Sequence, residues 1–213
     1  MAEVYSHESP MYSDDHLHQN GAYQYSVELV KNIIPAVKTK RPWVTIKLGK
    51  FCVDHAIYFI HNNQHPEWYR FLADYKDIVA VVGVPGTADR IRPYAEHVIY
   101  LPLSVDIEDI MRWERKKDKL VCYAGRKDKP GVELLDPKVV DMLYDMPRNL
   151  LLSEMARYCL VFAVGRTAIE AKCLGAQILP FDDRYPDPSI WKIVTNQEAA
   201  EILQDKLDMI DKR

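Results

Sequence analysis

The sequence predicts an α/β protein made of two small Rossmann-like units with mostly parallel sheets. Short apolar runs of strand length alternate along the chain with segments of helical periodicity. This alternation starts again after a charged stretch at 112–119, which indicates a second unit. A chain of 213 residues, 48% of them hydrophobic and 28% charged, is long enough for two small domains and has the composition of a globular protein.

The first unit is expected to span residues 1–106. It begins with a polar, aperiodic arm, after which apolar residues recur at helical spacing from Val27 to Ile34. Helices are also predicted from Pro66 and from Thr87. Buried strands are predicted at 43–48, 56–60, 78–84 and 98–103. Because strands and helices alternate, this sheet should be parallel and covered on both faces.

The second unit is expected to span residues 107–213. Its predicted strands are 120–124, 160–164 and 177–181, and its predicted helices are 150–158 and 166–174. The last segment, 198–210, carries apolar residues on one helical face and should pack back on the body of the protein.

Targeting and redox signals are sparse. The longest apolar stretches, 78–84 and 160–164, are too short for a membrane helix, and the start has no signal-peptide pattern, so we expect a cytoplasmic protein. No pair of cysteines has C-x-x-C spacing, which favours free thiols over a metal site or a disulfide framework. The four cysteines are Cys52, Cys122, Cys159 and Cys173.

The run from Leu160 to Phe181 is the most informative part of the chain. It predicts a strand, a turn at Gly165, a helix and a second strand. A helix that starts after a glycine presents free N–H groups and a positive dipole, both of which suit a phosphate held by Gly165, Arg166 and Thr167. The alternative is a tight turn followed by a solvated arginine.

Glu170 has two interpretations from its position in this helix. Thr167-Ala-Ile-Glu170 fits a capping box, in which the glutamate bonds the backbone of the cap residue and has no further role. Alternatively, the carboxylate accepts hydrogen bonds from the two hydroxyls of a ribose. The local pattern by itself favours the cap.

The order of these motifs resembles the nucleotide-sugar-binding half of glycosyltransferases with the two-domain GT-B fold. The run 160–181 is similar to the strand, glycine, helix with a glutamate, and second strand of that family. Val98–Asp106 is similar to its interdomain hinge. The strand ending in Gly125-Arg126, followed by Lys129 and a predicted helix, resembles the turn that holds the donor diphosphate.

The resemblance implies a nucleoside diphosphate sugar, expected to be UDP-linked, bound in a cleft between the units. Gly125, Arg126, Lys127 and Lys129 would neutralise the diphosphate, and Glu170 would take the ribose. His61 would be the catalytic base or a sugar contact, and Asn62 would line the cleft. The scheme requires no cofactor and no metal ion, since cationic side chains and a helix dipole neutralise the charge. It does not identify the acceptor.

Two alternatives from other functional classes stay open. Members of the family that retain stereochemistry carry two glutamates eight positions apart, but Phe162 stands eight positions before Glu170. This departure and the short chain favour a module that binds a nucleotide without turning it over. Residues 112–129 hold eight basic and three acidic residues within a chain of net charge −3, so a nucleic-acid-associated protein is the other alternative.

Overall fold

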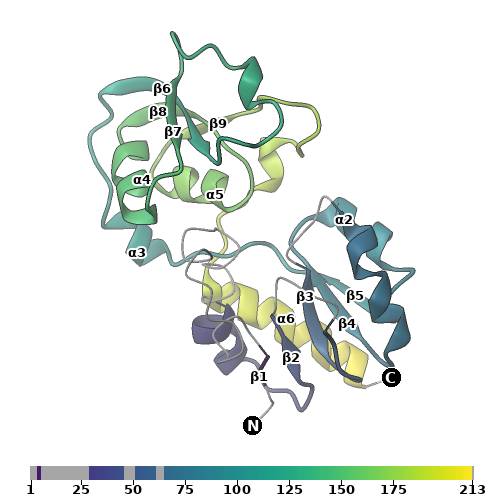
Figure 1. The fold of residues 1–213 in the computed structure, drawn as a ribbon. Helices are drawn as coiled ribbons and strands as arrows, with labels where there is room; N and C mark the ends of the chain where they lie inside the picture. Colours follow the sequence, from purple (N-terminus) through teal and green to yellow (C-terminus); the bar gives the residue numbers. More distant parts are fainter. Residues whose placement is uncertain (1–3, 6–28, 46–50, 61–64, 213) are drawn as a thin grey trace. The chain divides into compact units, whose positions relative to one another are not determined.

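The computed structural model describes residues 4–5, 29–45, 51–60 and 65–212. The chain divides into two compact units (Figure 1). Unit 1 comprises residues 1–102 and 196–213, and unit 2 comprises residues 103–195. Each unit is built around a parallel sheet, so the predicted α/β class with parallel strands is confirmed. Among the described residues, no helix has the length and apolarity needed to cross a bilayer.

Unit 1 contains a five-stranded parallel sheet with the strand order β1-β2-β3-β4-β5. The strands are β1 (Val4–Tyr5), β2 (Trp43–Val44), β3 (Ile57–Ile60), β4 (Val79–Val82) and β5 (His97–Tyr100). The helical segments are the π-helical η2 (Leu29–Ile33), the 3₁₀ segments η3 (Ile34–Ala36) and η4 (Pro66–Asp74), and the α-helices α2 (Pro85–Ile91) and α6 (Asn196–Asp211).

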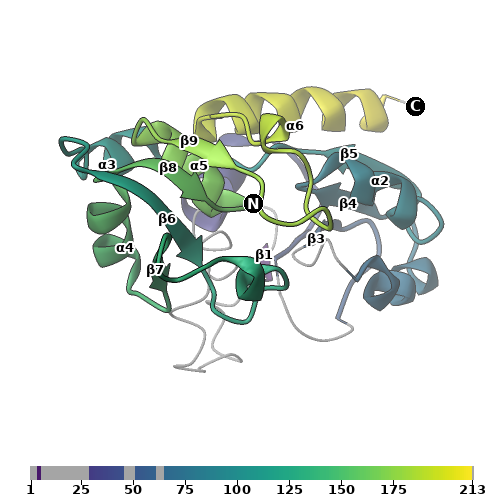
Figure 2. The same ribbon diagram turned by 90° about the horizontal axis from the view of Figure 1, so that it is seen from above.

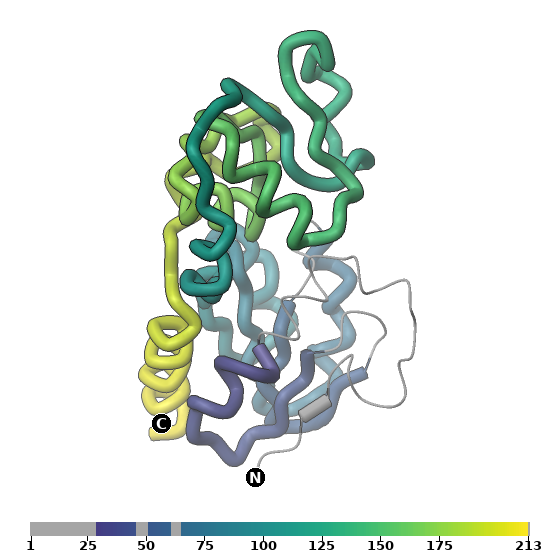
Figure 3. Tube along the Cα trace, turned by 90° about the vertical axis from the view of Figure 1, so that its left-hand side faces the viewer, coloured from purple at the N-terminus to yellow at the C-terminus, as the bar shows by residue number. Residues whose placement is uncertain are grey.

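The central strands of unit 1 are buried on both faces. Every residue of β3 and β4 is buried, as the continuous apolar runs predict. Alternate residues such as Tyr58 and Val82 pack with Leu72 of η4 and Ile91 of α2 in one core cluster. The helix α6 packs against η2, η3 and β5, and Figure 3 shows it beside the segment 29–36.

Unit 2 contains a four-stranded parallel sheet with the strand order β7-β6-β8-β9. The strands are β6 (Lys119–Gly125), β7 (Asp141–Tyr144), β8 (Tyr158–Phe162) and β9 (Gln177–Leu179). The helices are α3 (Ile107–Met111), η5 (Val132–Leu134), α4 (Arg148–Met155), α5 (Arg166–Cys173) and η6 (Pro188–Ile190). Figure 2 shows α5 beside β8 and β9, and α4 packs on β6, β7 and β8.

The structure differs from the sequence prediction in several elements. Val4–Tyr5, expected in a polar arm, forms strand β1 and pairs with β2, so that part of the arm prediction is wrong. Strand β7 was not predicted, because Asp141–Tyr144 is short and has only one fully buried side chain. The segment opened by Pro66 is a 3₁₀ helix. The last helix, expected in a second unit of residues 107–213, belongs to unit 1, because its apolar residues Ala199, Leu203 and Leu207 are buried there.

The chain passes between the units twice, at 102–103 and at 195–196. The first passage falls within the hinge-like segment 98–106. Next to these passages, Val105 forms a parallel bridge with Thr195, and the N–H of Val105 donates to the carbonyl of Val194 at 3.0 Å. All four cysteines are free, as predicted.

Candidate functional site

The strand order of unit 2 contains a change of direction at β6. From β6 the chain moves to β7 on one side, then returns past β6 to β8 and continues to β9. The strands β6 and β8 are neighbours, and the connections that leave them therefore run in opposite directions across the sheet. In open parallel sheets, ligands bind at such a switch point, at the carboxyl ends of the strands. The topology thus indicates a site where β6 and β8 end.

Two loops carry the sequence-predicted site residues to this edge. Tyr123 of β6 pairs with Phe162 of β8, so the strands end at nearly the same level. The β6 loop (125–131) contains Gly125, Arg126, Lys127 and Lys129. The β8 loop (163–165) ends at Gly165 and leads into α5, which begins with Arg166 and Thr167. Residues about 40 positions apart in the sequence are therefore placed at one sheet edge by the parallel pairing.

A buried tyrosine shapes the start of the β6 loop. The Tyr123 hydroxyl donates to the carbonyl of Arg126 at 2.7 Å. Burial raises the pKa of this phenol, so it remains a protonated donor. A Cβ atom at position 125 would lie 2.7 Å from the same hydroxyl oxygen, and Gly125 has a φ of 155°. The loop therefore requires glycine at this position.

Three cationic side chains follow within the β6 loop. Arg126 is exposed and pairs with Asp128 at 3.2 Å. The ammonium groups of Lys127 and Lys129 each lie 5.6 Å from a tyrosine ring centroid, that of Tyr144 and that of Tyr185 respectively. Burial, and then the charge of Arg126, lowers the pKa of Lys129 to about 8. An anion at this loop would relieve the repulsion between the cations.

The loop after β9 holds the β6 loop from the other side. The Tyr185 hydroxyl donates to the carbonyl of Pro130 at 3.1 Å. Gly131 has a φ of 90°, and a Cβ atom there would lie 2.5 Å from the Asp182 carboxylate. Phe181 packs edge-on against Tyr123, with ring centroids 5.5 Å apart. These contacts fix the backbone of the β6 loop, which carries the three cationic side chains.

Gly165 sets the backbone conformation at the start of α5. Gly165, the cap residue, has φ 64° and ψ −137°, a conformation that is essentially restricted to glycine. Glycine has no side chain, so the cap residue cannot use one to accept a hydrogen bond from the first N–H groups of the helix. The capping box interpretation is wrong. It requires Thr167 to be the cap residue before the helix, but Gly165 is the cap residue and Thr167 is the second residue of the helix.

Glu170 is the most buried member of a charge cluster that the sequence analysis did not include. Its side chain is 5% exposed, and its Oε1 accepts from Arg166 Nε at 3.0 Å and from Arg148 Nε at 3.1 Å. Arg148 Nη1 also donates to Asp109 at 2.9 Å. No sequence signal pointed to Arg148, because it stands in a different helix and only the packing of α4 against α5 brings it to Glu170.

No protein-family model, curated protein or solved structure matches the chain. Its function is therefore inferred from the edge of the sheet described above, and two further predicted site residues, His61 and Asn62, lie outside the described residues.

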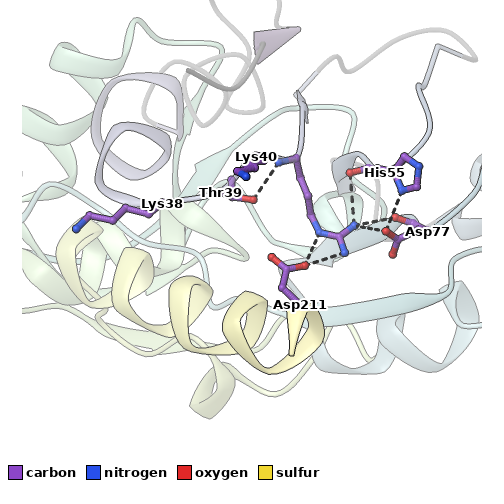
Figure 4. Close-up of a pocket in the computed structure, with 7 residues that line it drawn as sticks. Lys38, Thr39, Lys40, His55, Asp77 and Asp211 are labelled. Carbon is purple, nitrogen blue, oxygen red and sulfur yellow. Dashed lines mark hydrogen bonds and ion pairs between the residues drawn. The ribbon is translucent and has the colours of Figure 1, made fainter. Parts of the chain in front are cut away.

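Unit 1 has a charged hollow at the amino ends of the strands of its sheet, not at their carboxyl ends (Figure 4). Arg41, His55 and Asp77 line it, and each stands just before a strand, at the amino ends of the sheet. Arg41 donates to Asp77 Oδ2 at 2.9 Å and pairs with Asp211 of α6 at 2.9 Å. Since ligands of open parallel sheets bind at carboxyl ends, we interpret this hollow as the anchor of α6.

A group of three side chains that could ligate a metal borders this hollow. The ligand atoms of Asp77, Glu96 and His97 lie within 4.8 Å of one another. The same Asp77 carboxylate already pairs with Arg41, whose charge opposes a cation there. This group supports no metal centre.

Proposed function

We propose that unit 2 binds a nucleoside diphosphate sugar at the carboxyl edge of its sheet and that the protein acts as a compact glycosyltransferase. One observation carries this proposal: two glycine-dependent loops, one rich in cations and one that opens a helix, leave neighbouring strands at a topological switch point. This arrangement suits a ligand with a chain of phosphates.

In this proposal the phosphates bind to the N–H groups at the start of α5 and to the cations of the β6 loop. One phosphate accepts from the backbone at Gly165 to Thr167, where the helix dipole favours negative charge. Arg126, Lys127 and Lys129 neutralise the rest of the diphosphate. The same groups stabilise the negative charge that develops on the leaving diphosphate when the sugar is transferred.

In this proposal Glu170 has mainly a structural role, because its carboxylate already bonds to two arginines. It holds Arg148 and Arg166 at the start of α5 through Oε1. Because both arginines bond to Oε1 of Glu170, a ribose hydroxyl would donate to the other carboxylate oxygen, Oε2. A uridine diphosphate sugar remains the preferred donor, and His61 remains the proposed base of the transfer step.

The test is a thermal-shift titration of the full chain with UDP, UDP-glucose, UDP-N-acetylglucosamine, ADP-glucose and inorganic phosphate. A ligand at 100 times its Kd should stabilise the protein by about 2.7 kcal/mol. We expect stabilisation by at least one nucleoside diphosphate and little by phosphate alone. Absence of stabilisation by every nucleotide would overturn the proposal. Tight binding without release of UDP from any sugar would leave a nucleotide-binding module in place of a transferase.

The structure weakens the nucleic-acid alternative. Several basic residues of the stretch 112–129 have partners within unit 2. Lys117 donates to the carbonyl of Leu174 at 2.6 Å, and Lys119 bonds to the hydroxyl of Tyr158 at 2.8 Å. Such lysines are less available for phosphates along a nucleic-acid backbone.

A further inference from the structure

Trp68 is an exposed aromatic side chain that the nucleotide site does not use. It lies in η4 of unit 1 and is 60% exposed, whereas Trp43 and Trp191 are buried. Its neighbour Tyr69 and also Leu72 are buried in the core, so η4 is anchored to the unit and presents Trp68 outward. The anchored segment therefore holds the indole in place while leaving it accessible to a ligand.

The 3₁₀ geometry of η4 sets the orientation of this ring. In a 3₁₀ helix, side chains three positions apart eclipse one another. His65 and Trp68 have this spacing, and the N–H of Trp68 donates to the carbonyl of His65 at 3.1 Å. Their rings stack with centroids 4.8 Å apart and an angle of 13° between the planes. Because the imidazole covers one face, the exposed area of the indole lies on its other face and its edges.

Polar groups surround the stacked pair. The Glu67 carboxylate lies 3.1 Å from His65 Nδ1, which orients the imidazole. Arg90 of α2 lies 3.7 Å from the other oxygen of Glu67. The result is a flat, oriented aromatic face with a carboxylate and a guanidinium beside it.

We propose that Trp68, backed by His65, is a stacking platform for a saccharide ring. A pyranose has one face of C–H groups and a rim of hydroxyls. The C–H face covers the indole and removes its apolar area from water. The hydroxyls donate to Glu67 and accept from Arg90, so the rim of the sugar keeps its hydrogen bonds. The platform lies in the connection that leaves the carboxyl end of β3, the edge at which open parallel sheets bind ligands.

The local charge favours a neutral saccharide over a nucleic acid. A nucleobase would also stack on an indole, but a nucleic acid needs an excess of cations for its phosphates. The segments η4 and α2 together hold three acidic and two basic residues. All the groups that form the platform belong to unit 1. The proposal goes beyond the nucleotide site and does not depend on it.

The experiment uses the full chain without nucleotide. We titrate the protein with maltotriose, cellotriose, chitotriose and lactose and follow the quenching of tryptophan fluorescence by acrylamide. A single-stranded oligothymidylate of ten nucleotides is titrated in the same way to test for nucleic-acid binding. Affinity is measured in parallel by saturation-transfer NMR on the saccharide, which does not need Trp68 as its reporter. The variants are Trp68→Ala and Trp68→Phe, and Trp113→Phe is the control that removes an indole from unit 2.

We expect at least one saccharide to protect Trp68 from quenching. Its affinity should fall about tenfold or more in Trp68→Ala, which corresponds to about 1.4 kcal/mol, less in Trp68→Phe, and not at all in Trp113→Phe. The melting temperature should stay constant, because the side chain is exposed. No saccharide binding, equal affinity in Trp68→Ala, or protection by the thymidylate decamer alone would overturn the proposal. UDP binding in Trp68→Ala reports separately on the nucleotide site.

Discussion

Arg148 and Glu170 are 22 positions apart in the sequence, yet Arg148 Nε donates to Glu170 Oε1 at 3.1 Å. The same oxygen accepts from Arg166, so one nearly buried carboxylate compensates two guanidinium groups. Removing one partner of a buried ion pair leaves an uncompensated charge, which costs more than the pair contributes. The cluster therefore links the stability of unit 2 to the start of α5.

We predict that Glu170→Gln destabilises unit 2 by about 3 kcal/mol, the lower end of the range for breaking a buried ion pair. Glutamine keeps an acceptor but not the charge that both arginines face. The measurement is urea unfolding at pH 7, with Glu201→Gln on the exposed face of α6 as the control. An unchanged unfolding midpoint in Glu170→Gln would show that the charge cluster does not stabilise the fold.

Arg126→Ala should weaken UDP binding by about 1.5–3 kcal/mol, the range for hydrogen bonds to charged groups. The melting temperature without ligand should change little, because the side chain is 59% exposed. The matched control is Arg92→Ala. Arg92 is 65% exposed and pairs with Asp89 at 3.1 Å, much as Arg126 pairs with Asp128. Equal UDP affinity in both variants would remove Arg126 from the site.

Tyr123→Phe should destabilise the protein by about 1 kcal/mol, since it leaves the carbonyl of Arg126 without its buried donor. It should also weaken UDP binding, because this hydrogen bond shapes the backbone that carries the cations. Calorimetric titration with UDP and thermal unfolding measure the two effects. A loss of stability with unchanged affinity would mean that the loop conformation does not matter for the ligand.

Affinity for UDP should decrease as the pH rises through about 8, the pKa of Lys129. Burial lowers this pKa, so the ammonium group loses its proton close to neutral pH and then no longer attracts phosphate. Bound diphosphate should raise the pKa again, so binding takes up protons above pH 8. Titrations between pH 6.5 and 9.5 in two buffers measure both effects. Lys129→Met should abolish the dependence, and its persistence in that variant would assign it to another group.

Arg41→Ala should destabilise unit 1 by about 2 kcal/mol, because the guanidinium bonds to both Asp77 and Asp211. Burial tends to raise the pKa of Asp77, but hydrogen bonds from His55 and Arg41 lower it overall. A carboxyl with a lowered pKa contributes stability above its unfolded pKa and loses it as the pH falls through the folded value. The effect of Arg41→Ala should therefore shrink at acidic pH, which urea unfolding at pH 7 and pH 3 tests.

Much of the secondary structure followed from the sequence. The apolar runs at 56–60 and 78–84 predicted β3 and β4, because strands buried on both faces need continuous apolar residues. The glycines at 125 and 165 marked turns, and both adopt backbone conformations that favour glycine. These features are local, so periodicity and single residues were enough to predict them.

Tertiary structure decided what those elements do together. The strand order β7-β6-β8-β9 places the β6 and β8 loops at one edge, and no local pattern specifies which parallel strands become neighbours. The packing of α4 on α5 brought Arg148 to Glu170 in place of the expected capping box, whereas Arg166 pairs with Glu170 from within α5, four residues earlier. The helix α6 joined unit 1 because its apolar face is buried against η2, η3 and β5. An amphipathic pattern predicts that a helix buries one face, but the surface that receives this face is set by contacts between residues distant in the sequence.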